Sequence, residues 1–271
     1  MDFLLIKIII ALAVYILVEF VFRESIVFCI SRKKCTSFPL ITSGKWNAFI
    51  LLSPGLWISE NCKISIRNQF PSKSTYRIKL AIFIKNSNHL NFIVSLVLYV
   101  VLLFTTINFP RIDNEPLEIL AFVIMWRYIS RSVEIAFAFG RDILSPDSSS
   151  NLDNHERMWI AIKSYFEIFI YSAAFYSAFS CKVDTIFEPI LTSLFVGTLT
   201  NISGALELLI HCCEYDLSYK SLLLLSVYLQ VFATLSLIFF GFAGYLGRVK
   251  SNIKKSTHSP LMRAYRKSRA R

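Results

Sequence analysis

Four apolar segments, each long enough to cross a lipid bilayer as a helix, constrain this chain more than any other feature of its sequence. A membrane-spanning helix needs about 20 predominantly apolar residues. The segments that meet this requirement are Phe3–Phe22, Leu90–Asn108, Met158–Ser180 and Ser221–Leu246. A fifth segment, Leu117–Gly140, has the length but contains Arg127, Arg131 and Glu134. Only 17% of the residues are charged, against roughly 25% in soluble domains. The sequence therefore predicts an all-α membrane protein with about five transmembrane helices.

The first apolar segment is predicted to remain in the protein as an N-terminal membrane anchor helix over residues 1–22. A cleaved signal peptide has a shorter apolar core that is followed by small residues. Here the bulky and charged sequence Val21-Phe22-Arg23-Glu24 follows the apolar run. The segment is therefore interpreted as an uncleaved anchor.

Lys and Arg are distributed unevenly between the apolar segments. Residues 23–85 contain eleven of them and the residues after Leu246 contain nine, whereas residues 181–220 contain only two. Basic residues accumulate on the cytoplasmic side of membrane proteins. This rule places residues 23–88, residues 141–157 and the C-terminus inside, and the N-terminus, residues 109–116 and residues 181–220 outside. The pattern predicts a multi-pass protein of the cell (inner) membrane.

The chain divides into six predicted parts. They are the N-terminal membrane anchor helix (1–22), a basic cytoplasmic region (23–88), two transmembrane helices (89–144), a cytoplasmic linker (145–157), a pore-like domain (158–246) and a basic cytoplasmic tail (247–271). In the basic region, Ile64–Arg67 and Tyr76–Lys79 alternate apolar and polar residues, as strands do. The region is therefore expected to hold either a small strand hairpin or an interfacial segment.

The apolar stretch Phe187–Ile210 is predicted to enter the membrane and to return to the same side. A full crossing would move one of the two basic segments outside, against the observed charge bias. Glu188 and Pro189 suit the first turn of a helix. The other end of that helix, near Thr200, would carry a partial negative charge that favours a cation. The stretch is interpreted as a re-entrant pore helix followed by a turn with free backbone carbonyls.

Small, hydroxyl and amide residues follow the predicted pore helix. The candidate pore-lining and filter residues are Thr198, Thr200, Asn201, Ile202, Ser203, Gly204 and Ala205. They resemble the selectivity filter of the tetrameric potassium-channel family, particularly of bacterial members with additional helices, in which the filter reads Thr-x-Thr-Thr-x-Gly-Tyr-Gly-Asp. Arg131–Asp142 and Ser164–Ile168 also resemble segments of such proteins. Because Ser203 and Ala205 stand at two filter glycines, the filter is degenerate.

The resemblance implies a fold and a function for the C-terminal half. It implies an outer helix, a pore loop and an inner helix that assemble as a homotetramer around a potassium channel-like pore. The expected function is an ion channel or channel-like pore that conducts monovalent cations with weak selectivity. One alternative is a non-conducting, membrane-anchored interaction protein that docks a cytosolic protein partner or the lipid bilayer. Another is a regulated membrane-permeabilising effector of a stress or defence response.

Two groups of charged residues are further candidates for the pore and its support. The acidic residues on the predicted outer side are Asp184, Glu188 and Glu207. They would concentrate cations at a pore mouth. The alternative for this group is an ordinary polar loop. Charged residues inside the predicted spans are Arg127, Arg131, Glu134 and Glu167. Because charge inside a membrane is expensive unless it is paired, we expect Arg127 and Arg131 either to snorkel to the inner leaflet or to pair with Glu134 or Glu167 within the helix bundle.

No other chemistry is indicated by the sequence. It contains no nucleotide-binding loop, hydrolase triad or metal-ligand spacing, so we expect neither an enzyme nor a cofactor or metal. The basic tail lacks the interleaved aromatic residues of a nucleic-acid interface, and no nucleic acid is expected as a partner. Cys181 flanks the predicted pore loop on one side, and Cys212 and Cys213 flank it on the other. A disulfide across the loop and free thiols are both compatible with this placement.

Overall fold

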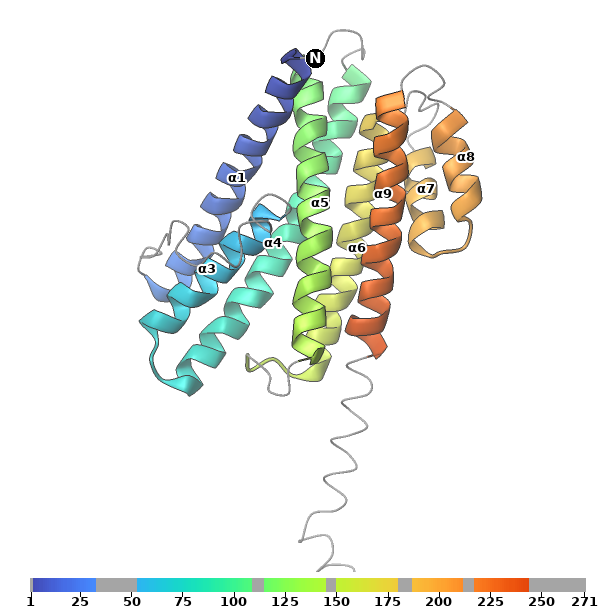
Figure 1. The fold of residues 1–271 in the computed structure, drawn as a ribbon. Helices are drawn as coiled ribbons and strands as arrows, with labels where there is room; N and C mark the ends of the chain where they lie inside the picture. The colour runs from blue at the N-terminus through green and yellow to red at the C-terminus, as the bar shows by residue number, and fades with distance from the viewer. Residues whose placement is uncertain are drawn as a thin grey trace, which may run out of the picture.

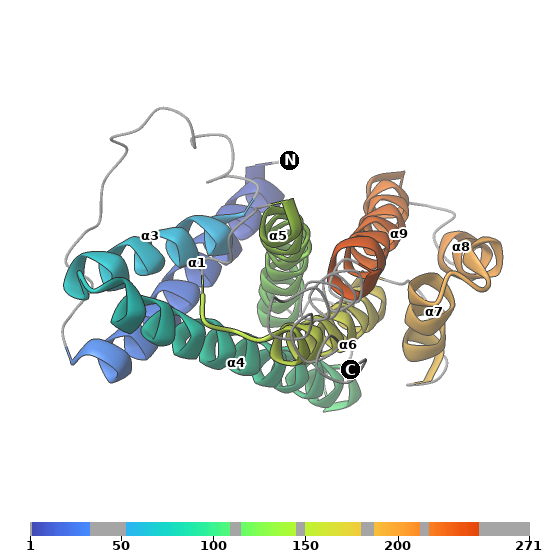
Figure 2. The ribbon, with the colours of Figure 1, turned by 90° about the horizontal axis from the view of Figure 1, so that it is seen from below.

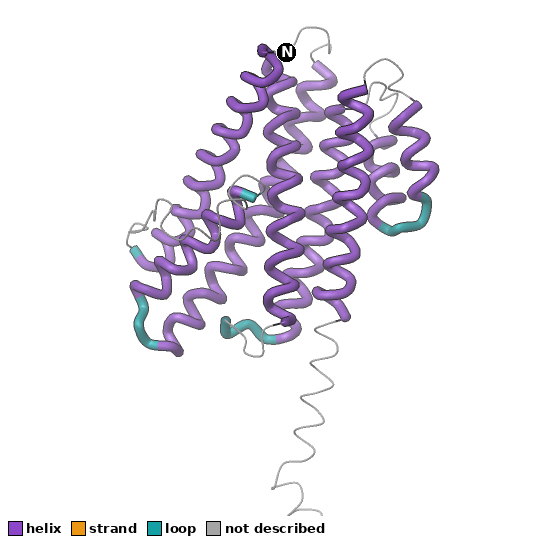
Figure 3. Tube along the Cα trace, in the orientation of Figure 1, coloured by secondary structure: helices purple, strands orange, loops and turns teal. Residues whose placement is uncertain are grey.

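The computed structural model of the protein describes residues 2–32, 53–108, 115–144, 150–179, 187–211 and 217–243. Within these ranges every regular element is helical (Figure 3). The helices are α1 (Asp2–Ser31), α3 (Pro54–Gln69), α4 (Lys73–Asn108), α5 (Glu115–Leu144), α6 (Asn154–Phe179), α7 (Phe187–Gly197), α8 (Ile202–His211) and α9 (Leu217–Ser236). A π-helical segment, η1 (Leu237–Ala243), continues α9. The prediction of an all-α protein is confirmed for this part of the chain.

Three helices in the described part of the chain are long and apolar enough to cross a membrane. These spans are Leu4–Ser31, Lys73–Thr106 and Lys220–Gly241. The structure therefore supports a membrane protein with transmembrane helices. α5 and α6 have sufficient length but carry charged and hydroxyl side chains in their central turns. For this reason they do not meet the same test of composition.

Five long helices, α1, α4, α5, α6 and α9, lie side by side (Figure 1). Each of them is antiparallel to the one before it in this order (Figure 1). Seen end-on, α5 and α6 lie between α1 and α4 on one side and α9 on the other (Figure 2). The central interface is dominated by buried aromatic side chains, among them Tyr128, Tyr171, Phe175 and Phe179. The outer faces of α1 and α4 expose Leu and Val side chains instead. This division is the one expected of a bundle surrounded by lipid, because only the interior provides partners for polar groups.

The strand hairpin predicted in the basic region is wrong. Ile64–Arg67 lies inside α3, and Tyr76–Lys79 lies in the first turns of α4. α3 begins where the Ser53 side chain accepts a hydrogen bond from the Leu56 amide, with proline at the first helical position. Its buried residues include Ile58, Cys62 and Ile66, which recur at helical spacing. An alternation of only four residues was too short to distinguish the period of a strand from the period of a helix.

The basic region is continuous with the flanking spans. α1 extends beyond residue 22 to Ser31, and α4 begins at Lys73. These extensions pack against α3 in a second apolar cluster, which contains Val27 of α1, Ile66 of α3 and Phe83 of α4. The predicted divisions at residues 22 and 89 therefore fall inside helices.

α7 and α8 form a short helical hairpin beside α6 and α9. α7 runs partway along the bundle, the chain turns at residues 198–201, and α8 returns toward the end where α7 began (Figure 1). α7 packs against α6 and α9, and α8 packs against α7 and α9. α7 thus begins, and α8 ends, at the same end of the bundle (Figure 1).

Candidate functional site

A tight C-terminal cap ends α7. The Leu199 amide donates to the Val196 carbonyl at 3.1 Å, and the Thr200 amide donates to the Phe195 carbonyl at 3.1 Å. This pair of bonds is the Schellman arrangement, in which one residue adopts the left-handed conformation. Leu199 is that residue, with φ of 60°. A side chain at such a position costs about 1–2 kcal/mol, so the turn is held by its surroundings rather than by local preference.

The last four carbonyl groups of α7 are all occupied. The Leu194 carbonyl accepts from the Thr198 amide, the Phe195 carbonyl from the Thr200 amide, and the Val196 carbonyl from the Leu199 amide. The Gly197 carbonyl accepts from the Tyr165 hydroxyl. The bond from Tyr165 to Gly197 is 3.0 Å long. The cap and α6 therefore supply donors to all four carbonyls at this end of α7. The predicted free carbonyls belong to the turn that follows and are not among these four.

The predicted filter residues from Ile202 to Ala205 form the first turn of α8. Asn201 precedes this helix, and its Oδ1 accepts a hydrogen bond of 3.0 Å from the Gly204 amide. Asn201 therefore acts as the N-cap of α8. Its carbonyl accepts from the Ala205 amide at 3.1 Å, and the Ala205 side chain is fully buried. The extended filter implied by the resemblance is thus replaced by a helix N-terminus.

The two helices of the hairpin present different chemistry at their exposed faces. α7 exposes the large apolar side chains of Phe187, Leu191 and Leu194. The turn and α8 expose polar side chains, namely those of Thr198, Thr200, Asn201, Ser203 and Glu207, alongside Leu208. Thr198 and Thr200 also hydrogen-bond to each other through their hydroxyls at 2.9 Å. One hairpin therefore carries an apolar edge and a largely polar edge.

Buried polar groups fix the hairpin to the bundle. The Ser193 hydroxyl of α7 lies 2.6 Å from the Ser172 hydroxyl of α6. The fully buried Gln230 of α9 donates to the Ser193 carbonyl at 2.8 Å and accepts from the Tyr176 hydroxyl at 2.7 Å. Because these groups have few alternative partners in an apolar interior, they define the position of α7 against α6 and α9.

Gly197 allows α7 and α6 to approach closely. A Cβ atom added at Gly197 would lie 2.3 Å from Cε1 of Phe169. A side chain at this position would force the Phe169 ring to shift. The glycine is therefore favoured by packing rather than by an unusual backbone angle.

The predicted outer-mouth residues are only partly described. Glu188 lies in the first turn of α7 and is half-buried, and Glu207 is exposed on α8. Asp184 lies outside the described residues, and so do Cys181, Cys212 and Cys213. Glu188 and Glu207 thus belong to the two arms of one hairpin.

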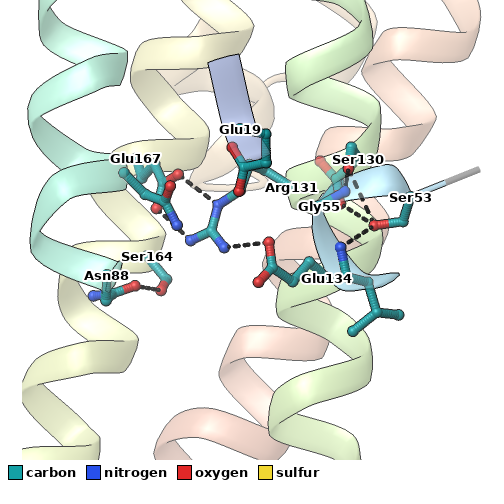
Figure 4. A network of polar contacts seen from close by, with 12 residues as sticks. Glu19, Ser53, Gly55, Asn88, Ser130, Arg131, Glu134, Ser164 and Glu167 are labelled. Carbon is teal, nitrogen blue, oxygen red and sulfur yellow. Dashed lines mark hydrogen bonds and ion pairs between the residues drawn. The ribbon is translucent and has the colours of Figure 1, made fainter. Parts of the chain in front are cut away.

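A second polar site lies in the interior of the five-helix bundle. Six side chains from three helices form an unbranched chain of alternating charge. Figure 4 labels four of them, Glu19, Glu134, Arg131 and Glu167. In order, the six side chains are Arg127, Glu19, Arg23, Glu134, Arg131 and Glu167. None of them is more than 6% exposed. Three positive and three negative charges make this buried ion chain neutral.

Arg131 holds the centre of the α5–α6 contact. Its Nε and Nη2 atoms donate to the two carboxylate oxygens of Glu167, each at 2.7 Å, and its Nη1 donates to Glu134 at 2.8 Å. The expected pairing of Arg131 with these two carboxylates is present. Arg127 instead donates to Glu19 at 2.5 Å and to Asn91 at 2.9 Å.

α1 contributes Glu19 and Arg23, which the sequence analysis did not identify as site residues. Arg23 donates to Glu19 at 2.5 Å within α1 and to both oxygens of Glu134 at 2.9 Å. The available signal was a carboxylate and a guanidinium four residues apart near the end of an apolar segment. α1 is therefore part of the charged interior of the bundle and not only an anchor.

The start of α3 is tied to the same region by hydroxyl groups. Ser130 of α5 accepts from the Tyr15 hydroxyl at 2.7 Å and from the Gly55 amide at 3.2 Å. The Ser53 hydroxyl donates to the Ser130 carbonyl at 2.9 Å (Figure 4). α3 is thus positioned by side chains beside the buried ion chain.

A cavity of about 270 Å³ extends from the buried ion chain toward the end of the bundle where α3 lies. Its cationic lining residues are Arg23, Lys63, Arg131, Arg141 and Arg157, and its acidic lining residues are Glu134 and Asp142. Buried hydroxyls, including those of Ser59 and Ser87, and the rings of Phe83 and Phe139 complete the lining. The cavity therefore combines ion-paired cationic side chains and hydroxyls with an apolar wall.

The chain was compared with protein-family models, with characterised proteins and with solved structures, and none of them matches it. A function for this protein must therefore be argued from the hairpin, the buried ion chain and the cavity.

Proposed function

We propose that the protein is a multi-pass membrane protein whose α7–α8 hairpin lines an oligomeric pore for monovalent cations. In this proposal α1, α4, α5, α6 and α9 each cross the bilayer, and the hairpin enters from the outer side. The alternating directions of these helices support five crossings. The charges of α5 and α6 are compatible with crossing because they are paired inside the bundle.

The contrast between the two edges of the hairpin is the single observation that carries the proposal. An apolar edge such as that of α7 is stable against lipid. The hydroxyls and the carboxylate exposed along the turn and α8 are not, because the hydrocarbon interior offers them no hydrogen-bond partners. A water-filled lumen between subunits would satisfy them. Each subunit would then turn α8 toward the lumen and α7 toward lipid or a neighbouring subunit.

Side-chain oxygens, rather than backbone carbonyls, would contact the ion in such a pore. The hydroxyls of Thr200 and Ser203 and the carboxylate of Glu207 would provide the oxygen ligands and the negative field. In the tetramer implied by the resemblance, Glu207 would form a ring of four carboxylates. Acidic rings select cations over anions but discriminate weakly between monovalent cations. Weak cation selectivity is thus the expected behaviour.

Reconstitution tests this function. The purified protein is placed in planar bilayers under a KCl gradient, and the reversal potential is measured for wild type, Glu207→Gln and Glu207→Asp. We expect a cation-selective current, a loss of much of the cation-over-anion preference in Glu207→Gln, and retention of the preference in the charge-conserving Glu207→Asp. A silent bilayer at every voltage, with a properly folded oligomer, would support the non-conducting interaction protein instead.

A further inference from the structure

The cavity beside the buried ion chain is separate from the hairpin and is not needed for conduction as proposed above. It lies among α1, α3, α4, α5 and α6, whereas the hairpin contacts α6 and α9. Its inner end is formed by Arg23 and Arg131, and its outer part by Lys63, Arg141 and Arg157. A volume of about 270 Å³ is close to the lower limit of small-molecule sites, which begin near roughly 300 Å³. The cavity is large enough for a small ligand.

The distribution of charge around the cavity is one-sided. Five cationic side chains and two carboxylates line it, so the lining has a net charge of +3. The carboxylates that complete the ion pairs, Glu19, Glu60 and Glu167, are not among its lining residues in the described part of the chain. Each of the five cations is nevertheless ion-paired with a carboxylate, and three of these carboxylates lie outside the lining.

Arg23 has hydrogen-bonding capacity left at the inner end of the cavity. The bonds that Arg23 donates to described residues use Nε and Nη2. Its Nη1 therefore has two N–H groups available, on a residue that is only 2% exposed. The buried hydroxyls of Ser59 and Ser87 line the same cavity. A ligand with several acceptor oxygens would satisfy these donors.

We propose that this cavity binds a small, phosphate-bearing anion. A phosphate group carries one to two negative charges and several strong acceptor oxygens, and guanidinium groups match its geometry with paired donors. The rings of Phe83 and Phe139 provide a surface for an attached apolar or sugar portion. The ligand would enter at the end of the bundle where α3 lies, which is the cytoplasmic end in the proposed topology. The same chemistry is offered by a soluble phosphoester and by the headgroup of an inner-leaflet phospholipid.

Equilibrium binding to the purified full-length protein tests the proposal without measuring conduction. The soluble probe is radiolabelled inorganic pyrophosphate, applied to protein in a non-ionic detergent. We expect saturable binding of one pyrophosphate per chain, weakened by increasing salt. In the second arm, lipid nanodiscs containing either phosphatidic acid or phosphatidylcholine compete with pyrophosphate. Selective competition by phosphatidic acid identifies a lipid headgroup as the occupant, and its absence identifies a soluble phosphoester.

Two variants and a matched control show whether this cavity is the site. Ser87→Glu introduces a carboxylate into the cavity and should weaken pyrophosphate binding about tenfold or more, because it opposes the anion directly. Arg141→Gln removes one cation near the partly exposed outer part and should weaken binding several-fold. Lys7→Gln removes a cation from the opposite end of α1, where it pairs with Glu118, and should leave binding unchanged. Thermal unfolding confirms that each variant is folded.

The proposal is overturned if wild-type protein shows no saturable pyrophosphate binding. It is also overturned if folded Ser87→Glu binds pyrophosphate as tightly as wild type does. Neither result depends on whether the hairpin conducts ions, so failure here and failure of the proposed pore are separate outcomes.

Discussion

Arg131 and Glu167 meet across the α5–α6 interface in a two-pronged ion pair, with both guanidinium-to-carboxylate distances at 2.7 Å. This geometry uses two donors and both carboxylate oxygens, which is the strongest arrangement open to these groups. Glu167 is fully buried, and among the described residues its carboxylate accepts these hydrogen bonds from Arg131. The contact between α5 and α6 therefore depends on this pair.

Glu167→Gln should destabilise the protein strongly. The substitution leaves Arg131 with one carboxylate, Glu134, and breaking a buried ion pair on one side costs about 3–5 kcal/mol. We expect a large fall in the thermal unfolding midpoint of the detergent-solubilised protein. Glu118→Gln is the matched control because its side chain is 48% exposed and pairs with Lys7, so its effect should stay below about 1 kcal/mol. Equal effects of the two substitutions would contradict the structural importance of the Arg131–Glu167 pair.

Leu199→Gly should stabilise the hairpin turn. Glycine adopts a positive φ without the steric cost of a side chain, and Leu199 has φ of 60°. The expected gain is about 1 kcal/mol, seen as a higher unfolding midpoint. Leu199→Ala keeps most of the strain while removing the leucine side chain, and it should not stabilise. A lower midpoint for the glycine variant would mean that leucine packing outweighs backbone strain at this position.

Gly197→Ala should disturb the docking of α7 on α6. The new methyl group would overlap the Phe169 ring, and overpacking of this kind costs about 1–3 kcal/mol. The unfolding midpoint and the protease sensitivity of the hairpin report the effect. Gly140→Ala in α5 serves as the control, since the nearest atom to its new Cβ would be 3.8 Å away. If both alanine variants behaved alike, Gly197 would not be a close-packing position.

The Glu60 carboxylate gives the end of the bundle where α3 lies a defined acid sensitivity. Burial raises the pKa of Glu60, but hydrogen bonds from Arg141 and the charge of Lys63 outweigh it and lower the pKa to about 2. Because the folded-state pKa lies below the unfolded value of about 4.3, this group stabilises the fold above pH 4.3. Its contribution is lost as the pH falls toward 2.

Glu60→Gln should therefore reduce the loss of stability between pH 4.5 and about 2 relative to wild type. Urea unfolding of both proteins across this range provides the measurement. At neutral pH the variant should be less stable than wild type, and the two curves should converge at low pH. Parallel curves across the whole range would show that Glu60 does not titrate as described.

The sequence predicted elements whose signals are local. Apolar segments of sufficient length indicated the long helices, and Glu188 with Pro189 indicated the start of α7 at Phe187. Ser53 followed by Pro54 was an equally good sign of a helix start, and it would have corrected the strand expected at Ile64–Arg67 in α3. Asn201, followed by a helical run, was likewise a recognisable N-cap.

Other features required the tertiary structure. Arg127 could have paired with any buried carboxylate, and its contact with Glu19 exists because α1 packs against α5. The capping of the α7 carbonyls depends partly on Tyr165, which approaches from α6. The cavity is formed by five helices that are separated along the chain. No local pattern in the sequence encodes these three arrangements, because each is a consequence of which helices become neighbours.

Water accessibility of the two hairpin edges tests the central claim most directly. Ser203→Cys and Leu191→Cys are made in a background in which the six native cysteines are replaced, and a membrane-impermeant thiol reagent is applied during current recording in planar bilayers. We predict that the reagent blocks the current through Ser203→Cys and leaves the current through Leu191→Cys unchanged. A current that responds equally in both variants, or protein that carries no current at all, would contradict a pore lined by α8.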